Sequence, residues 1–429
     1  MNFQHSIING VHVATAEMPH MESVSAGIHL PIGSRYESMK LNGIAHFAEH
    51  MIFKGTQTRT ALDLAIQVEG AGGTINAFTT EDQTCVETRG PADLLPQFIE
   101  VMSDMVWNST YDAEELERER EVIIEEIIMY QENPSDHIHD LLSEALWTNH
   151  PLSRPITGTE ESIKNITSDE LKNFTQEHYL KGNQGLTLSV AGKITHDRVC
   201  ELAKKYLPQL DNTPSNENKF ETFDPSTTIN KFTHLHDQRD IEQVHLVIGF
   251  HTEGRHSDER HVLRVLSLIM GETMSSRLFQ ELREKRGLCY HVASDYSLYH
   301  DTGTFEIHLG LDAARLTESL MTINDMIQQI IQNGFTDDEL EQAINYATGQ
   351  SKISLESTHA RMNWMGDSLL CFSKIISPKE AIETLNSTTV SELNELSLKI
   401  FNVKNMAVAS IGPQRADEIQ REISNLIHF

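Results

Sequence analysis

The stretch Leu41-Asn-Gly-Ile-Ala-His46-Phe-Ala-Glu49-His50-Met-Ile-Phe-Lys-Gly55 places two histidines and a glutamate within five residues. Residues four apart on a helix share one face, so His46 and His50 can bind one metal ion with Glu49 beside it. The residues around them predict a packed helix that stops at Gly55, with these apolar contacts: Ile44, Phe47, Met51 and Phe53. The stretch therefore predicts a helix that presents two imidazoles together.

These residue types suit hydrolysis that is assisted by a divalent metal ion. Neutral imidazole is a good zinc ligand, and a catalytic zinc usually has three protein ligands and one position open to water. Zinc lowers the pKa of that water, and a nearby carboxylate such as Glu49 can take its proton and pass it to a leaving amine. For the motif alone, a surface helix with solvated side chains is the alternative, because the chain contains 22 histidines.

A third ligand is expected from another element, and a second helix offers carboxylates. Residues 111–131 are predicted as one long helix with Asp112 as its N-cap and this apolar stripe: Val122, Ile123, Ile127 and Ile128. Glu119 and Glu126 are seven residues apart and share one face of that helix. For most of its glutamates, a solvated charged face is the alternative.

With these two helices, the sequence resembles the pitrilysin/insulinase family of zinc metallopeptidases, whose zinc motif is the inverted form. It is most similar to the two-domain type, which includes the mitochondrial processing peptidases and their bacterial relatives. The resemblance covers essentially the whole chain. Four segments carry it: His46–Thr56, Ala71–Thr84, Glu119–Ile127 and Ser275–Tyr290.

The resemblance implies a complete metal site. Its three zinc ligands would be His46, His50 and Glu126. Glu49 would be the general base, and Glu119 would support activity from the position seven residues before the third ligand. Glu125 is the neighbour that could be confused with this ligand, but the spacing from Glu119 favours Glu126.

The resemblance also implies two groups of substrate-binding residues. In the family, the segment 71–84 is an exposed edge strand beside the zinc, and the substrate pairs with it at Asn76 and Ala77. Such pairing recognises an extended peptide with little regard to its side chains. Residues 74–80 alternate like a strand after the Gly72-Gly73 turn, and an ordinary hairpin strand is the alternative for the rest of the segment.

Arg286 and Tyr290 form the second group, in the other half of the chain. By the resemblance, they face the zinc across a chamber and bind the substrate near the scissile carbonyl. Donors aimed at a developing oxyanion are worth several kcal/mol. Without the family, both would be interpreted as surface residues.

An internal duplication predicts an α+β protein of two homologous domains, each a mostly antiparallel sheet with helices on one face. Residues 23–33 correspond to 242–250, and helix-to-strand units begin at Thr167 and Thr389. The predicted parts are a zinc domain (1–210), a linker (211–228) and a C-terminal domain (229–429), which together enclose a chamber. Other predicted elements are a first strand at 10–18 and helices at 314–332 and 336–355.

Composition limits the partners and the compartment. A net charge of -29 argues against nucleic acid and anionic membranes, and would attract basic peptides if it lined the chamber. No apolar run reaches the roughly 18 residues of a membrane span. Four widely spaced cysteines suit a reducing compartment, and the first ten residues lack a secretory or mitochondrial leader, so a cytoplasmic protein is predicted.

The sequence thus predicts a zinc endopeptidase that cleaves extended or unfolded peptides. Because one chain carries both groups of site residues, a homodimer is predicted rather than a subunit with a different partner. A non-catalytic peptide-binding or scaffolding member of the same family is the alternative, and a metal carrier is a weaker third hypothesis. The histidines at 137, 139, 251, 256 and 261 are interpreted as surface residues of a histidine-rich chain, so no second metal site is predicted there.

Overall fold

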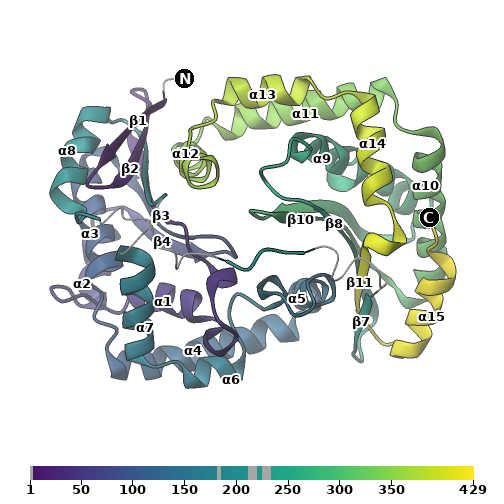
Figure 1. Cartoon of the computed structure of the whole chain (residues 1–429), viewed down its shortest axis with the longest axis horizontal. Helices are drawn as coiled ribbons and strands as arrows, with labels where there is room; N and C mark the ends of the chain where they lie inside the picture. Colours follow the sequence, from purple (N-terminus) through teal and green to yellow (C-terminus); the bar gives the residue numbers. More distant parts are fainter. Residues whose placement is uncertain (1–2, 181–184, 211–219, 225–232) are drawn as a thin grey trace. The chain divides into compact units, whose positions relative to one another are not determined.

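The structure, a computed structural model, describes residues 3–180, 185–210, 220–224 and 233–429. Two compact units, each built on one β-sheet, make up the chain (Figure 1). Unit 1 comprises Met1–Ile128, Arg154–Glu221 and Lys352–Ser377, and unit 2 comprises Met129–Ser153, Thr222–Ser351 and Pro378–Phe429. The predicted α+β class, with two related sheets, is confirmed.

The sheet of unit 1 has the strand order β1-β2-β6-β3-β5-β4. Its strands are β1 (Phe3–Ile8), β2 (Val11–Glu17), β3 (Ser23–Leu30), β4 (Thr74–Thr79), β5 (Thr84–Pro91) and β6 (Thr187–Gly192). All neighbours pair antiparallel except β2 and β6, which are parallel. The predicted first strand at 10–18 is in fact the second, because β1 is a half-exposed edge strand with a weak apolar pattern.

The sheet of unit 2 has the order β7-β11-β8-β10-β9. Its strands are β7 (Thr233–Gln238), β8 (Gln243–Glu253), β9 (Cys289–Leu298), β10 (Thr302–Asp312) and β11 (Met406–Gly412). This order repeats β2-β6-β3-β5-β4 of unit 1, including the one parallel pair, here β7 with β11. The strand-for-strand correspondence agrees with the duplication predicted from the sequence.

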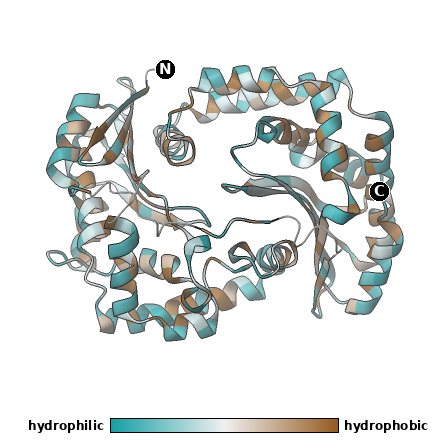
Figure 2. Ribbon diagram, in the orientation of Figure 1, coloured by the Kyte–Doolittle hydropathy of each residue, from teal (hydrophilic) through white to brown (hydrophobic). Residues whose placement is uncertain are grey.

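One face of each sheet carries the main apolar core. In unit 1 the helices are α1 (Ile44–Ile52), α2 (Ala61–Val68), α3 (Leu95–Asn108), α4 (Ala113–Glu132), α6 (Glu160–Asn165), α7 (Ser168–Thr175) and α8 (His196–Tyr206). In unit 2 they are α9 (Arg260–Ser267), α10 (Leu316–Asn333), α11 (Asp337–Ser354), α13 (Pro378–Asn386), α14 (Val390–Ile400) and α15 (Ala416–Leu426). Hydrophobic and hydrophilic residues are interspersed along most of these helices (Figure 2). Their buried apolar side chains join those of the strands in one core cluster per unit. No helix in the described ranges is both long and apolar enough to cross a bilayer.

The opposite face of each sheet is covered by one helix from the other half of the chain. Helix α12 (Thr358–Phe372) packs on β2, β3 and β6 of unit 1, and α5 (Pro134–Leu146) packs on β7, β8 and β11 of unit 2. The prediction of helices on one face therefore omitted these two. The compact units likewise differ from the predicted contiguous domains, because each sheet has a second apolar face that must be buried. Most of the predicted linker lies outside the described residues.

The contact between α12 and its sheet predicts the effect of a small substitution. A Cβ at Gly366 would overlap the ring of His29, a fully buried residue of β3 whose Nε2 is hydrogen bonded to Ser189. Gly366→Ala should lower the free energy of unfolding by about 1–3 kcal/mol. Gly349→Ala, in α11 where nothing lies near the added methyl, should instead raise it by roughly 0.5–1 kcal/mol. Chemical denaturation measures the free energy of unfolding of both variants. Equal changes in the two variants would contradict the described packing of α12 on His29.

Candidate metal centre

Helix α1 is anchored at its beginning by a buried carboxylate. Glu37 accepts hydrogen bonds from the backbone N–H groups of Gly43, at 2.7 Å, and Ala45, at 2.8 Å. Gly43 has a φ of 89°, where a side chain would be strained and would meet Thr157. Ile44, Phe47 and Met51 are buried as predicted. Their packing determines which face of the helix points into the core and which face carries the histidines. The sequence prediction missed Glu37.

Helix α4 provides the second side of the site. Asp112 accepts hydrogen bonds from the N–H groups of Glu114 and Glu115, which confirms it as the N-cap. The predicted apolar stripe needs one correction, because Val122 is 51% exposed whereas Ile124 is buried. Moving one residue along a helix turns the side chain by roughly 100°, so Val122 lies off the buried face.

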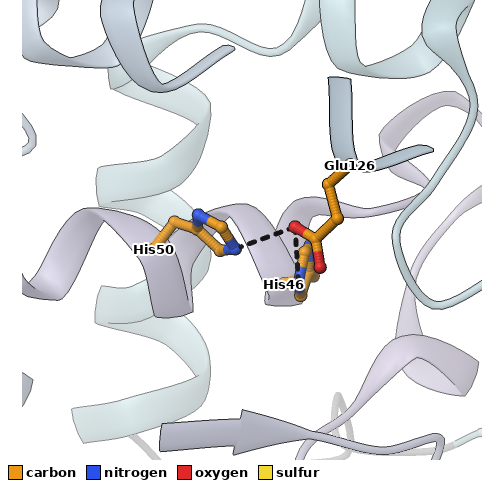
Figure 3. Close-up of side chains that lie close together, drawn as sticks. All are labelled: His46, His50 and Glu126. Carbon is orange, nitrogen blue, oxygen red and sulfur yellow. Dashed lines mark ion pairs between the residues drawn. The ribbon is translucent and has the colours of Figure 1, made fainter. Parts of the chain in front are cut away.

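His46, His50 and Glu126 lie close together, two from α1 and one from α4 (Figure 3). Oε2 of Glu126 is 3.8 Å from Nε2 of His46 and 3.4 Å from Nε2 of His50. Tetrahedral zinc with ligands at about 2.0–2.2 Å would hold its ligand atoms roughly 3.3–3.6 Å apart. The two distances to Glu126 are therefore within a few tenths of an ångström of those in a zinc site, and all three donor atoms lie within 4.8 Å of one another.

The electrostatics of the two imidazoles also fit a cation. Burial lowers the pKa of His46 to about 4, and the neighbouring His50 adds to this, so the ring is neutral as a metal ligand must be. Burial also acts to lower the pKa of His50, but Glu119 and Glu126 outweigh it and raise the value to about 9. The carboxylates of Glu119 and Glu126 thus favour a positive charge next to His50.

Glu119 contacts Nδ1 of the His50 ring, whereas Nε2 of the same ring faces Glu126. Its Oε1 is 2.9 Å from Nδ1 of His50, and its Oε2 is 2.5 Å from Nζ of Lys54. A proton on Nδ1 donated to Glu119 leaves the lone pair of Nε2 directed toward Glu126. Such a carboxylate partner is typical of metal-binding histidines. Glu119 therefore contacts Nδ1 of His50 and leaves Nε2 facing Glu126, and Lys54, whose role the sequence prediction missed, neutralises the charge of Glu119.

Replacement of Glu119 should weaken metal binding without removing a ligand. Glu119→Gln leaves a weaker, neutral acceptor for Nδ1 of His50, so we expect zinc affinity to fall by roughly 10- to 100-fold. Competition with a chromophoric chelator measures this affinity. Glu121→Gln, an exposed position on the same helix, is the matched control and should bind zinc like the wild type. Unchanged affinity in Glu119→Gln would show that the hydrogen bond does not orient the ligand.

Glu49 lies on the same helix as the two histidines and is tied to a strand. Its Oε2 accepts a hydrogen bond of 2.6 Å from Oγ1 of Thr79, the last residue of β4. Burial raises the pKa of Glu49, and the charge of Glu126 raises it further, against the opposing effects of Thr79 and His50. A raised carboxylate pKa suits proton transfer near neutral pH. Thr79 was not predicted as a site residue.

Strand β4 is the edge of its sheet next to Glu49. It pairs with β5, where Asn76 faces Glu87 and Ala77 faces Val86, and no further strand follows it among the described residues. Asn76 is exposed and Ala77 is buried. The strand predicted at 74–80 is thus present as Thr74–Thr79, with a free edge that can accept an extended chain.

Arg286 and Tyr290 belong to the other compact unit. Tyr290 lies on β9 and is 80% exposed, and Arg286 precedes that strand with a weak ion pair of 3.9 Å to Glu281. Exposed polar groups of this kind are available to a ligand. Their placement opposite the metal site stays a prediction.

Comparison with known proteins identifies the class of protein that carries this site. A family model described as Insulinase (Peptidase family M16) matches residues 12–160, and one described as Peptidase M16 inactive domain matches residues 165–346. The uncharacterized zinc protease YmxG of Bacillus subtilis is 35% identical, covering 94% of this chain and 97% of its own. An uncharacterized zinc protease of Mycobacterium leprae is 31% identical over 94% and 90% of the two chains. The chain belongs to the insulinase family, peptidase family M16.

Solved structures show the same fold. A protease from Helicobacter pylori has a TM-score of 0.88 at 21% identity, covering 96% of this chain and 99% of its own. A peptidase M16 inactive domain from Pseudomonas fluorescens has a TM-score of 0.87 at 22% identity, covering 97% and 99%. These structures confirm the predicted two-sheet architecture, and the family models and relatives confirm the predicted family.

Proposed function

We propose that the protein is a zinc-dependent endopeptidase that cleaves extended or unfolded peptides. The observation that carries this proposal is the convergence of His46, His50 and Glu126 on one point with the carboxylate of Glu49 nearby. The names of the relatives, uncharacterized zinc proteases, support both the metal and the class of reaction.

The residues divide the work of hydrolysis. Bound zinc would supply Lewis-acid chemistry, acidifying water and polarising the scissile carbonyl. Glu49 takes the proton of the attacking water and delivers it to the leaving amine, and Thr79 holds that carboxylate in place. Glu119 keeps His50 in the tautomer that binds metal.

Substrate recognition rests on the backbone of β4. An extended peptide can add to the free edge beside Glu49, so Asn76 and Ala77 would contact it mainly through main-chain groups. Arg286 and Tyr290 are the proposed donors near the scissile carbonyl. The proposed assembly is a homodimer of self-sufficient chains.

A non-catalytic role has one supporting observation, the description of the model that matches residues 165–346 as an inactive domain. Residues 165–346 contain neither Glu49 nor any of the candidate zinc ligands. All of these lie within residues 12–160, which match the insulinase model. The presence of three ligands and a base favours catalysis over peptide binding alone.

The test is cleavage of a quenched fluorescent peptide by the purified protein. We expect turnover that is lost with a zinc chelator and restored by added zinc. A zinc-loaded protein that binds the peptide without cleaving it would support the non-catalytic alternative and overturn the proposal. Comparison of an unfolded protein with its folded form tests the preference for extended chains.

A further inference from the structure

Unit 2 contains a second group of metal-ligating side chains, made by His139 of α5 with Glu306 and His308 of β10. Oε2 of Glu306 is 3.9 Å from Nδ1 of His139 and 3.3 Å from Nε2 of His308. The corresponding distances at the first site are 3.8 and 3.4 Å. Two imidazoles and a carboxylate oxygen thus converge as they do around Glu126.

The fold explains why these three residues meet. Glu306 and His308 are two apart on β10, so their side chains point to the same face of the sheet. Helix α5 covers that face, and it approaches closely because Gly249, the β8 partner of Glu306, has no side chain. A Cβ at Gly249 would lie 2.9 Å from Leu142 of α5. Leu142 follows His139 by three residues, on the same side of the helix.

The duplicated position in unit 1 shows what is particular to this site. There Gly27 is the β3 partner of Glu87, and a Cβ at Gly27 would meet Met362 of α12. His359, three residues before Met362, contacts Glu87 at 2.9 Å. The residue two positions after Glu87 is Arg89, which is exposed and carries a cation. Unit 1 therefore has one imidazole and one carboxylate, whereas unit 2 has a second imidazole, His308, in place of the arginine.

The surroundings of the group leave its donor atoms available. Thr304 donates a 2.8 Å hydrogen bond to Oε1 of Glu306, so Oε2 remains directed at the histidines. Nε2 of His308 is buried and faces Oε2 of Glu306 at 3.3 Å without a well-aligned hydrogen bond, and the Glu306 side chain is only 14% exposed. His139 is half exposed, and a cavity of about 400 Å³ adjoins the group, lined also by His245 and His291. An ion can enter from this side and keep water as a further ligand.

We propose that His139, Glu306 and His308 form a second binding site for a divalent transition-metal ion, with zinc as the best match to two nitrogens and one oxygen. The site does not depend on the proposed function. A bound ion would tie α5, which comes from the first half of the chain, to the sheet of unit 2. Metal binding there would therefore stabilise the folded chain.

The test is the zinc content of the full-length protein after equilibration and removal of free metal, measured by mass spectrometry of the element. We expect two ions per chain for the wild type, one for His50→Ala, one for His308→Gln and none for the double variant. His359→Gln, the matched histidine of unit 1, should retain two. Circular dichroism establishes that each variant is folded.

Thermal unfolding supplies a second measurement if His308→Gln folds poorly. Zinc should raise the Tm of His50→Ala, and it should not raise that of His50→Ala combined with His139→Gln. Equal zinc content in His308→Gln and the wild type would overturn the proposal. The proposal would also be overturned if the wild type held one zinc ion per chain and His50→Ala held none.

Discussion

Replacing Glu49 with glutamine should reduce peptide cleavage by roughly 10²- to 10⁴-fold, because the amide cannot accept the proton of the attacking water. The side chain keeps its size and can still accept the hydrogen bond from Thr79. Zinc bound by His46 and His50 should therefore be retained. Initial rates on a quenched fluorescent peptide, with zinc content measured on the same sample, test both expectations.

The control for this variant is Glu125→Gln, an exposed glutamate near the site. It removes the same charge from the protein and should leave the rate unchanged. A Glu49→Gln protein that cleaves at the wild-type rate would refute the assigned base. A variant that loses both zinc and activity would show instead that Glu49 is needed to hold the metal.

Replacing Glu126 with alanine should remove zinc from the first site. The variant loses one of three protein ligands and the negative charge that both imidazoles face at 3.8 and 3.4 Å. We expect zinc affinity to fall by more than the roughly 10- to 100-fold typical of losing a hydrogen-bond partner of a ligand. Activity should fall with it and return in part at high zinc concentration.

Glu125→Ala separates this effect from a general loss of charge on α4. It removes the adjacent carboxylate, which is exposed, and should bind zinc as the wild type does. If Glu125→Ala lost the metal and Glu126→Ala kept it, the third ligand would have been assigned to the wrong residue. Chelator competition on the two variants, run side by side, distinguishes these outcomes.

Local patterns in the sequence predicted the parts of the site that depend on helical spacing. His46 and His50 lie on one face because they are four residues apart, and the packed side of α1 follows from Ile44, Phe47 and Met51. The spacing of Glu119 and Glu126 likewise predicted that both would face one side of α4. Family resemblance then assigned the roles, since spacing alone left several glutamates open.

Contacts between distant segments could not be read from such patterns. The hydrogen bond from Thr79 to Glu49 and the ion pair of Lys54 with Glu119 depend on how α1 packs against β4 and α4. The exchange of α5 and α12 between the sheets required knowledge of which faces remained uncovered. For the same reason, a search for helical spacing around His139 missed the carboxylate and imidazole that β10 supplies.

The most direct measurement is an anomalous difference map, recorded at the zinc absorption edge, from a crystal of the zinc-loaded protein. We expect a strong peak about 2.0–2.2 Å from Nε2 of His46, Nε2 of His50 and a carboxylate oxygen of Glu126. A zinc-replete crystal with no peak among these three side chains would contradict this expectation.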